Sequence, residues 1–546
     1  MKFKNDRFIY FFSCLLITPL IFHFIYSSYG FNPTDDGLFL SASRRIIDGE
    51  IPHLDFISIR PAGSALFHIF EVLYAGDYLY YLTRLFVWFQ FSAISFFWME
   101  VMKKKLFLRD RYLFDIILIV ISVMFCSHTF PIMSNPTVDG IFFCSLGIYL
   151  IALDKYNLKT IGYFLLGCTP LFKQSFLLVP FFVIFIFDDY KNYKHILLIL
   201  TASIVYLLAM IGLGAISDFF IQLSSVDANI IDIGIISFLT NKYIYFGILI
   251  SILIKLFTQS NRIVYNTKLV LVYISTIIIL TLLYYILQEK ISNNIFWSIS
   301  YILFGISMGL IIIDLIFKFN ISKHIIKIMS IVYVIAWSVT LSTGYSTPAL
   351  FSGILFIALI THLNVSYLML SNNKEKIFAF IILILFSGVY NYSRKNYVYR
   401  DLPVNELNYK LDNILPGGKN IFTSKNTFLV IRDVKMLTKK YKNEKIVFIP
   451  DYPGFWAASD INNPLPADWI QKVEVPYGGP YNKLTESVIA VASSGIIIMQ
   501  KYSMHKISEG FSLLKESKYH PIISFVKNNV KKIDQSDYYE IFSNKK

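Results

Sequence analysis

Long apolar runs separated by short basic loops are the feature that most limits what this chain can fold into. The first run covers residues 8–26, and similar runs follow through most of residues 1–392. A helix of about 20 apolar residues can cross the hydrocarbon core of a bilayer. Hydrophobic residues make up 55% of the chain and its mean hydropathy is +0.56, which is more apolar surface than a soluble fold can bury. We therefore expect an α-helical polytopic membrane protein.

The positive charge of the chain lies in the loops and indicates an orientation. The formal net charge is +14, which in a soluble protein would point to nucleic acid. Here the lysines and arginines gather between apolar runs, at residues 2–7, 103–111, 188–195, 262–268, 318–327 and 374–376. Cytoplasmic loops of membrane proteins are rich in these residues. We therefore expect these loops and the N-terminus to be cytoplasmic, and we expect no nucleic-acid partner.

Alternating the runs from a cytoplasmic N-terminus gives about 13 membrane spans within residues 1–392. The first run has no small-residue cleavage site after it, so we interpret it as a retained anchor. The apolar stretch at residues 160–187 is too long for one helix. Because Pro170 and Lys173 interrupt it, the sequence predicts two helices there.

Residues 393–546 are much more polar than the rest of the chain, and we expect them to form a small soluble domain on the outer face. Short apolar runs at residues 445–449 and 495–499 predict buried strands. Helical patterns at residues 428–441 and 508–517 lie beside these runs. Strands alternating with helices in this way are typical of an α/β layer.

A hexapeptide occurs twice, and both copies are expected on the outer face. The first, Asn-Pro-Thr-Asp-Asp-Gly at residues 32–37, lies in a first outer loop of residues 27–81. The second, Asn-Pro-Thr-Val-Asp-Gly, occupies residues 135–140. The threonine of the first copy would cap a helix whose first turn holds Asp35 and Asp36, which is a purely structural role. Carboxylates at a membrane boundary are costly unless solvated or used, so the same residues also indicate a site.

The first outer loop carries further groups that suit group-transfer chemistry. It contains Asp55 and Arg60, and the second hexapeptide contributes Asp139. A carboxylate that accepts a hydroxyl proton, near a cation that binds phosphate, is a minimal set for transfer from a phosphate-linked donor. His53 and Asp55 alone are too few ligands for a metal site. Helical spacing of apolar residues around Phe39 predicts an amphipathic helix along the membrane.

Four stretches of the chain resemble the GT-C glycosyltransferases. The first outer loop has acid-acid-Gly, a helix, a Gly-x-x-Pro turn, Asp-aromatic and a basic residue with Pro, at residues 35–61. Asp139 opens a span where the family often has Asp, and residues 162–178 contain glycines with a lysine, Lys173, near their end. A weaker likeness lies at residues 344–348, which include Tyr345. More narrowly, the chain is similar to the protein mannosyltransferase and aminoarabinose transferase group, glycosyltransferase family 39.

The resemblance implies roles at the matching positions only. Asp35 would orient or deprotonate the acceptor hydroxyl, with Asp36 as its partner. Arg60 stands where the family has a basic residue that contacts the donor phosphate, and arginine offers a two-pronged fork there. Lys173 would help hold the phosphate or would simply reach the interface, and Asp139 would assist the acceptor or a metal or would cap a helix. Asp55 and Tyr345 would be weaker members of the same cavity.

The resemblance also implies a GT-C-like fold and an inverting sugar transfer. The donor would be a polyprenyl-phosphate sugar, and the acceptor an envelope lipid, such as lipopolysaccharide, or a glycan. The site would face the periplasm of a bacterial inner membrane. Ile59 stands where some members have an acidic metal ligand, which leaves a divalent metal open. The sequence has no Gly-rich phosphate loop, so we expect no nucleotide cofactor.

Three alternatives stay open at this point. A transporter or flippase of lipid-linked glycans would also place charges in a membrane cavity, although such proteins often contain inverted repeats. An O-antigen polymerase or ligase is expected to use a late, basic outer loop instead. In the C-terminal region, Tyr452, Phe455 and Trp456 would either stack on sugar rings or pack in a core.

Overall fold

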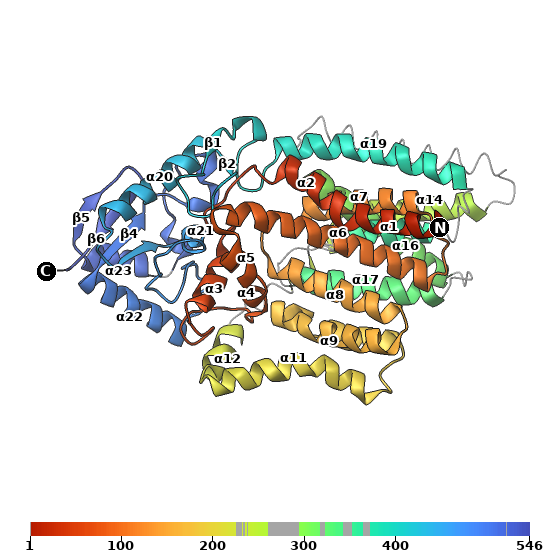
Figure 1. The fold of residues 1–546 in the computed structure, drawn as a ribbon, viewed down its shortest axis with the longest axis horizontal. Coiled ribbons are helices and arrows are strands. Elements are labelled where there is room, and N and C mark those ends of the chain that lie inside the picture. Colours follow the sequence, from red (N-terminus) through yellow and green to blue (C-terminus); the bar gives the residue numbers. More distant parts are fainter. Residues whose placement is uncertain are drawn as a thin grey trace.

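The computed structural model divides into a long helical bundle and a C-terminal domain that covers one end of it (Figure 1). It describes residues 2–224, 239–259, 294–316, 323–341, 352–363, 372–519 and 521–545, together with residues 232, 235 and 236. The first part of the helical region is α1 (Lys2–Phe12), the π-helical turn η1 (Ser13–Ile17), α2 (Thr18–Tyr26), α3 (Leu38–Ile47), α4 (Gly63–Phe67), α5 (Ile69–Tyr74), η2 (Gly76–Tyr78), α6 (Leu79–Lys105), α7 (Tyr112–Thr129), α8 (Pro136–Ala152) and α9 (Tyr156–Phe172). The second part is η3 (Gln174–Phe176), α10 (Val179–Ile186), α11 (Tyr193–Gly212), α12 (Ile216–Ser224), α14 (Lys242–Gln259), α16 (Asn294–Ile316), α17 (Lys323–Leu341), α18 (Ser352–Leu363) and α19 (Asn372–Asn396).

Four helical stretches in the described part of the chain are long and apolar enough to cross a membrane. They are Asp6–Tyr26, Gly76–Lys105, Tyr193–Gly212 and Ser298–Ile316. Shorter apolar helices, including Tyr112–His128 and Pro136–Ala152, run beside them. The structure is therefore compatible with a membrane protein, as its composition predicts, but the expected count of about 13 spans is not confirmed.

The bundle is organised around α6. In the span that contains α6, 78% of the apolar window is buried, against 28% for the span that contains α11. Trp88 and Trp98 of α6 are almost fully buried, and α2, α7 and α8 pack around them (Figure 1). The α11 helix lies at the edge of the bundle and leaves most of its apolar surface outward. Such a surface needs lipid or another apolar medium around it.

The predicted break in the stretch at residues 160–187 is confirmed. Helix α9 contains Pro170 and ends at Phe172, and η3 and α10 follow. Proline removes a helix hydrogen bond and clashes with the preceding turn, so the helix ends shortly after it. The amphipathic helix expected near Phe39 is α3, with Leu40 buried and Arg44 facing outward.

The C-terminal domain is an α/β domain with one four-stranded sheet. Its elements are η6 (Val404–Glu406), β1 (Tyr409–Lys410), β2 (Phe422–Thr423), α20 (Lys425–Lys440), β3 (Ile446–Ile449), α21 (Pro453–Trp456), α22 (Gly479–Ser494), β4 (Ile496–Gln500), η7 (Met504–Glu509), η8 (Glu516–Lys518), α23 (Ile522–Asn529), β5 (Lys532–Gln535) and β6 (Tyr539–Phe542). The sheet order is β3-β4-β6-β5, with β3 and β4 parallel and the other pairs antiparallel.

Strands β3 and β4 are buried on both faces, which explains their unbroken apolar sequences. Side chains of Phe448 and Ile498 face one core with α20, whereas Val447 and Ile497 face another with α22 and α23. In a strand that is covered on both faces, successive side chains are all buried, so apolar residues need not alternate with polar ones. The two predicted strands and the helix predicted at residues 428–441 are thus confirmed, as β3, β4 and α20.

The helix predicted at residues 508–517 is wrong. Its first two residues end η7, and an extended segment follows in which Leu513 forms a bridge with Tyr502. Gly510 has φ +155°, which ends the helical turn. The apolar residues Phe511 and Leu513 alternate as in a strand, and this period of two competes with the helical pattern.

One hydrophobic core joins the two parts of the molecule. Phe31 and Leu40 from the segment between α2 and α6, with Tyr80 of α6, pack with Phe448 and Phe455 of the C-terminal domain. We call residues 27–78, between α2 and α6, the first loop. Because the first loop and the domain share a core, they are held as one unit at one end of the bundle (Figure 1).

Candidate functional site

The first hexapeptide forms a closed turn that the side chain of its asparagine stabilises. The side-chain oxygen of Asn32 accepts the backbone N–H groups of Thr34 at 3.1 Å and Asp35 at 3.0 Å. The carboxylate of Asp36 accepts the N–H of Asn32 at 2.8 Å. Asn and Asp favour such turns because their short side chains imitate a backbone acceptor. The helix-cap role for the threonine is wrong, because α3 begins only at Leu38 and its preceding residue makes no side-chain cap.

Asp36 anchors the turn to the bundle. Its second oxygen accepts a hydrogen bond from Arg84 of α6 at 3.0 Å, and both side chains are buried. Arg84 also donates to the carbonyls of Ser27 and Gly30 at 2.7 and 2.6 Å. A single guanidinium with several donors thus fixes the chain from the end of α2 to the turn. Asp36 therefore holds the turn in place beside Asp35.

Asp35 faces the C-terminal domain. Its carboxylate accepts a hydrogen bond from the hydroxyl of Tyr399 at 2.9 Å and forms an ion pair with Arg400. The residue is 7% exposed, and burial raises the pKa of its carboxyl, although the nearby Arg400 acts in the opposite direction. A carboxylate with a raised pKa is a better proton acceptor than a solvated one.

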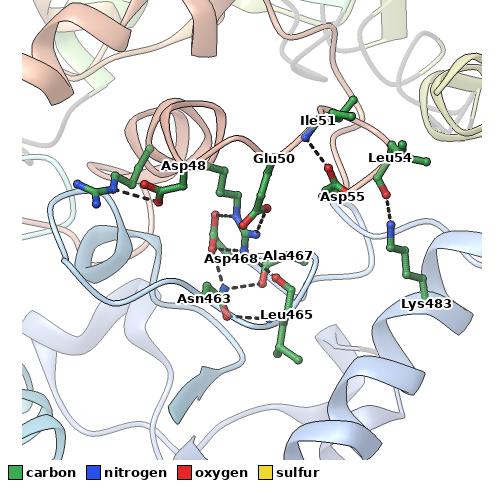
Figure 2. A network of polar contacts seen from close by, with 12 residues as sticks. Asp48, Glu50, Ile51, Leu54, Asp55, Asn463, Leu465, Ala467, Asp468 and Lys483 are labelled. Carbon is green, nitrogen blue, oxygen red and sulfur yellow. Dashed lines mark hydrogen bonds and ion pairs between the residues drawn. The ribbon is translucent and has the colours of Figure 1, made fainter. Parts of the chain in front are cut away.

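An ionic network forms the wall between the first loop and the C-terminal domain (Figure 2). Arg45 of α3 pairs with Glu50 at 2.7 Å and with Asp468 at 2.8 Å, and it also donates to the carbonyl of Leu465. Asn463 holds Asp468 from the other side at 2.7 Å. The charges and hydrogen-bonding groups of this network are paired with one another. We therefore infer that the network attaches the C-terminal domain to the first loop.

A small cavity lies beside this wall, between α3, the end of the first loop and residues 466–474. Its volume is about 60 Å³, and Phe39, Phe56 and Trp469 line it together with Arg60 and Glu474. Arg60 donates to the two carboxylate oxygens of Glu474 at 2.8 and 2.9 Å. The predicted phosphate-binding arginine is thus at the cavity, but a carboxylate from the C-terminal domain already holds its fork.

Lys173 adds a second buried cation to the same region. The lysine lies between α9 and η3, and the next residue, Gln174, donates to the carbonyl of Ile59 at 2.9 Å. Its ammonium donates to Thr137 at 2.9 Å and forms no ion pair within the described residues. Burial and the positive charge of Arg60 lower the pKa of Lys173 to about 7, against the attraction of Glu474. Glu474 therefore pairs directly with Arg60 and acts on Lys173 only through its charge, without contact.

Asp139 belongs to a separate buried network. It accepts hydrogen bonds from Ser64 and, at 2.8 Å, from Gln90, and it lies 3.2 Å from the imidazole of His68. The other nitrogen of that imidazole lies 3.0 Å from Glu71. None of these side chains is a partner of Asp35 or Asp36. The structure thus places Asp139 inside the bundle, away from the cluster at the first hexapeptide.

Of the two weaker members of the predicted site, only Asp55 is described, and it lies apart from the cavity. Asp55 is exposed and accepts the N–H of Ile51 at 2.7 Å, which closes a local turn (Figure 2). Tyr345 lies outside the described residues. The imidazole of His53 lies between Gln222 and Tyr206, each at 3.1 Å. In the described part of the chain, no group of three or more His, Cys, Asp and Glu side chains is placed to hold a metal ion.

Core packing, rather than sugar stacking, explains the aromatic run of the C-terminal domain. Tyr452, Phe455 and Trp456 are at most 4% exposed and belong to the core that the domain shares with the first loop. The aromatic side chain of the C-terminal domain that lines the cavity is Trp469. An indole ring beside polar groups offers the kind of flat apolar surface on which a sugar can stack.

Sequence reasoning missed four residues that surround Asp35 and Arg60. Tyr399, Arg400 and Glu474 contact them directly, and Asp451 is a buried carboxyl whose pKa burial raises to about 7. One signal was available for Arg400. It follows the last apolar run, and a cation at that place is on the same expected side of the membrane as the acids of the first loop.

We compared the chain with protein-family models, with curated proteins and with solved structures, and found no match in any of the three.

Proposed function

We propose that this protein is an integral membrane glycosyltransferase of the GT-C type. It would transfer a sugar from a polyprenyl-phosphate donor to an envelope lipid or glycan. The observation that carries the proposal is a pair of buried basic side chains at the cavity and next to it: Arg60 lines the cavity and is paired with Glu474, and Lys173 has no carboxylate partner among the described residues. Buried charges are costly unless they are balanced, and a phosphate group would supply the missing negative charge.

Asp35 supplies the second half of the chemistry. Burial raises the pKa of Asp35, and the negative charges of Asp36 and, more weakly, Glu474 act in the same direction. In the proposed step the acceptor oxygen attacks the anomeric carbon of the sugar and gives its proton to Asp35. The bond from that carbon to the phosphate oxygen breaks with inversion, and the polyprenyl phosphate leaves.

The cations stabilise the charge that develops on the departing phosphate. Because Glu474 holds the fork of Arg60, donor binding must displace this carboxylate or add to the pair through Lys173. Lys173 needs no such exchange, since among the described residues its ammonium donates to the neutral hydroxyl of Thr137 and pairs with no carboxylate. We therefore assign Lys173 the first contact with the phosphate and Arg60 the second.

The proposal includes a location and an orientation. The helices and the basic loops suit a multi-pass protein of a bacterial inner membrane with a cytoplasmic N-terminus. The first loop and the C-terminal domain would then face the periplasm, where a lipid-linked donor is available and cytoplasmic nucleotides are absent.

The test is sugar transfer by the purified full-length protein in detergent, from labelled polyprenyl-phosphate sugars to envelope lipid extracts. We expect transfer by the wild type and at least a hundred-fold loss in Asp35→Asn, which removes the proton acceptor. Asp55→Asn is the matched control, because it changes an exposed aspartate of the same loop. Movement of donor across vesicle bilayers without transfer would instead support the flippase.

A further inference from the structure

A second, larger cavity lies far from the proposed active site. Its volume is about 410 Å³, and the ends of α6, α8 and α10 and the beginning of α17 surround it. Helix α6 begins at Leu79, in the core shared with the C-terminal domain, and ends at Lys105, which lines this cavity. Its 27 residues span about 40 Å at 1.5 Å per residue. This distance matches the thickness of a bilayer with its headgroups.

The polar side of the cavity carries unbalanced positive charge. Lys104, Lys105 and Lys327 line it, and Asp154 is the carboxylate among the lining residues. Lys327 already pairs with Asp188.

Asp154 also has a cation of its own. Lys159 lies 3.5 Å from it and 2.8 Å from Asp189. Neither Lys104 nor Lys105 forms an ion pair within the part of the chain that the structure describes. The cavity therefore presents two lysines that an anion can reach.

The other side of the cavity is apolar. Ile186, Phe187, Ile328 and Ile331 line it, and the ammonium of Lys105 lies 5.1 Å from the centre of the Phe187 ring. An ammonium over the face of an aromatic ring is attracted by the ring's negative charge density. A ligand that fills the cavity therefore needs an anionic group attached to an apolar part.

Phe107 at the rim indicates the medium in which this end of the bundle lies. Its side chain is 82% exposed, and its backbone has φ +55°, which is unfavourable for a residue with a side chain. An aromatic ring held outward at such a cost suits the interfacial layer of a membrane, where aromatic residues concentrate.

We propose that this cavity binds the headgroup of an anionic phospholipid. The phosphodiester contacts Lys104 and Lys105, and the acyl chains run along Ile186 and Ile328 out of the cavity. Basic pockets between helices at one membrane face commonly bind such lipids. The proposal does not depend on sugar transfer, because the site is one membrane thickness from Asp35.

Native mass spectrometry of the full-length protein in neutral detergent tests the site. The probes are phosphatidylglycerol, cardiolipin, phosphatidylcholine and inorganic phosphate, each added alone. We expect the two anionic lipids to bind and the other two probes to bind at least ten-fold more weakly. Inorganic phosphate binding as tightly as phosphatidylglycerol would show a site for the soluble ion and would overturn the proposal, as would equal binding of phosphatidylcholine.

A pair of double variants separates the cavity from general surface charge. Lys104→Gln with Lys105→Gln should weaken phosphatidylglycerol binding about thirty-fold, from about 1 kcal/mol per lysine. Lys191→Gln with Lys194→Gln removes the same charge from exposed positions just before α11 and in its first turn, and should weaken binding less than three-fold. Equal losses in both variants, or no loss in the first, would overturn the proposal.

The charge-conserving change keeps the test valid if the glutamine variant fails to fold. Lys104→Arg with Lys105→Arg retains both cations and should retain binding within about three-fold. A folded arginine variant that has lost the lipid would show that charge at these positions does not hold it, and this result also overturns the proposal.

Discussion

The two hexapeptide copies begin alike and end differently. In both, the asparagine side chain accepts the backbone N–H of the threonine two residues on, at 3.1 Å for Asn32 and 2.9 Å for Asn135. The second copy continues directly into α8, so its aspartate points into the bundle. The first copy closes on itself and turns Asp35 toward another domain. The same local sequence thus gives a structural acid in one place and a candidate proton acceptor in the other.

The different roles of the two aspartates come from the elements that surround each hexapeptide. Asp139 is fully buried, and its partners come from α4, from the His68 linker that follows α4, and from α6. Asp35 is also buried, but Tyr399 and the partly exposed Arg400 come from the segment after α19. An acid enclosed by rigid helices has no route to a substrate. An acid at the contact of two parts has such a route when those parts separate slightly.

The largest expected effect on stability is that of Asp139→Asn. The change removes the charge that faces the His68 imidazole and leaves Glu71 as its carboxylate partner, in a network without solvent. Breaking a buried charge pair costs about 3–5 kcal/mol. We expect a clear fall in the melting temperature of the detergent-purified protein. Asp35→Asn is the matched comparison. It should lower the free energy of unfolding by about 1 kcal/mol, because the partly exposed Arg400 can be solvated when it loses its partner. Equal falls would mean that both acids are structural.

A second prediction concerns the pH dependence of transfer. Arg400 lowers the pKa of Asp35 against the effect of burial, so Arg400→Gln should raise that pKa further. The proposed base works only when deprotonated, and the acid limb of the rate profile should therefore move to higher pH. We expect a several-fold loss of transfer at acid pH and a smaller loss at alkaline pH. Arg44→Gln, which breaks an ion pair on α3, is the control. A limb that stays in place would remove Asp35 from the proposed role.

Replacing the glycine of each copy with alanine should destabilise a different part of the molecule. A Cβ at Gly37 would lie 2.5 Å from the Cα of Gly454, and one at Gly140 would lie 2.6 Å from the Phe176 ring. Each alanine variant is expected to cost about 1–3 kcal/mol through overpacking. Limited proteolysis should show faster cleavage between α19 and α20 in Gly37→Ala, because that contact joins the C-terminal domain to the first loop. The same cleavage in Gly140→Ala would contradict this separation.

The sequence predicts those features that depend on neighbours along the chain. The proline in α9, the apolar runs of β3 and β4 and the amphipathic α3 all follow from local patterns, and the structure confirms them. The helix predicted at residues 508–517 fails because Gly510 and an alternating apolar pattern favour an extended segment. The count of spans is not confirmed, because part of the region in which spans were expected lies outside the described residues. Within the described residues, several apolar helices are shorter than a full span.

The site depends on contacts that no local pattern contains. Tyr399 is 364 residues from Asp35, and Glu474 is 414 residues from Arg60. The charges of Asp35 and Arg60 indicate that partners are needed but do not identify them. The prediction that Asp139 shares a cavity with Asp35 assumed that the aspartates of two similar hexapeptides lie in similar surroundings. The structure separates them because α8 begins inside the bundle, whereas the first copy meets the C-terminal domain.

The smallest expected effects come from the asparagines themselves. Asn135→Ala removes one side-chain acceptor at the start of α8 and should cost about 1 kcal/mol, as other helix caps do. Asn32 accepts two backbone N–H groups and the hydroxyl of Thr34, so Asn32→Ala should cost up to about 2 kcal/mol. Both losses of stability can be measured as changes in the free energy of unfolding by denaturant in detergent. Asn32→Asp and Asn135→Asp retain the acceptor oxygen and serve as controls. Since the Asn32 turn also positions Asp35, only Asn32→Ala should lower transfer, and an equal loss in Asn135→Ala would show that the two copies act in one site.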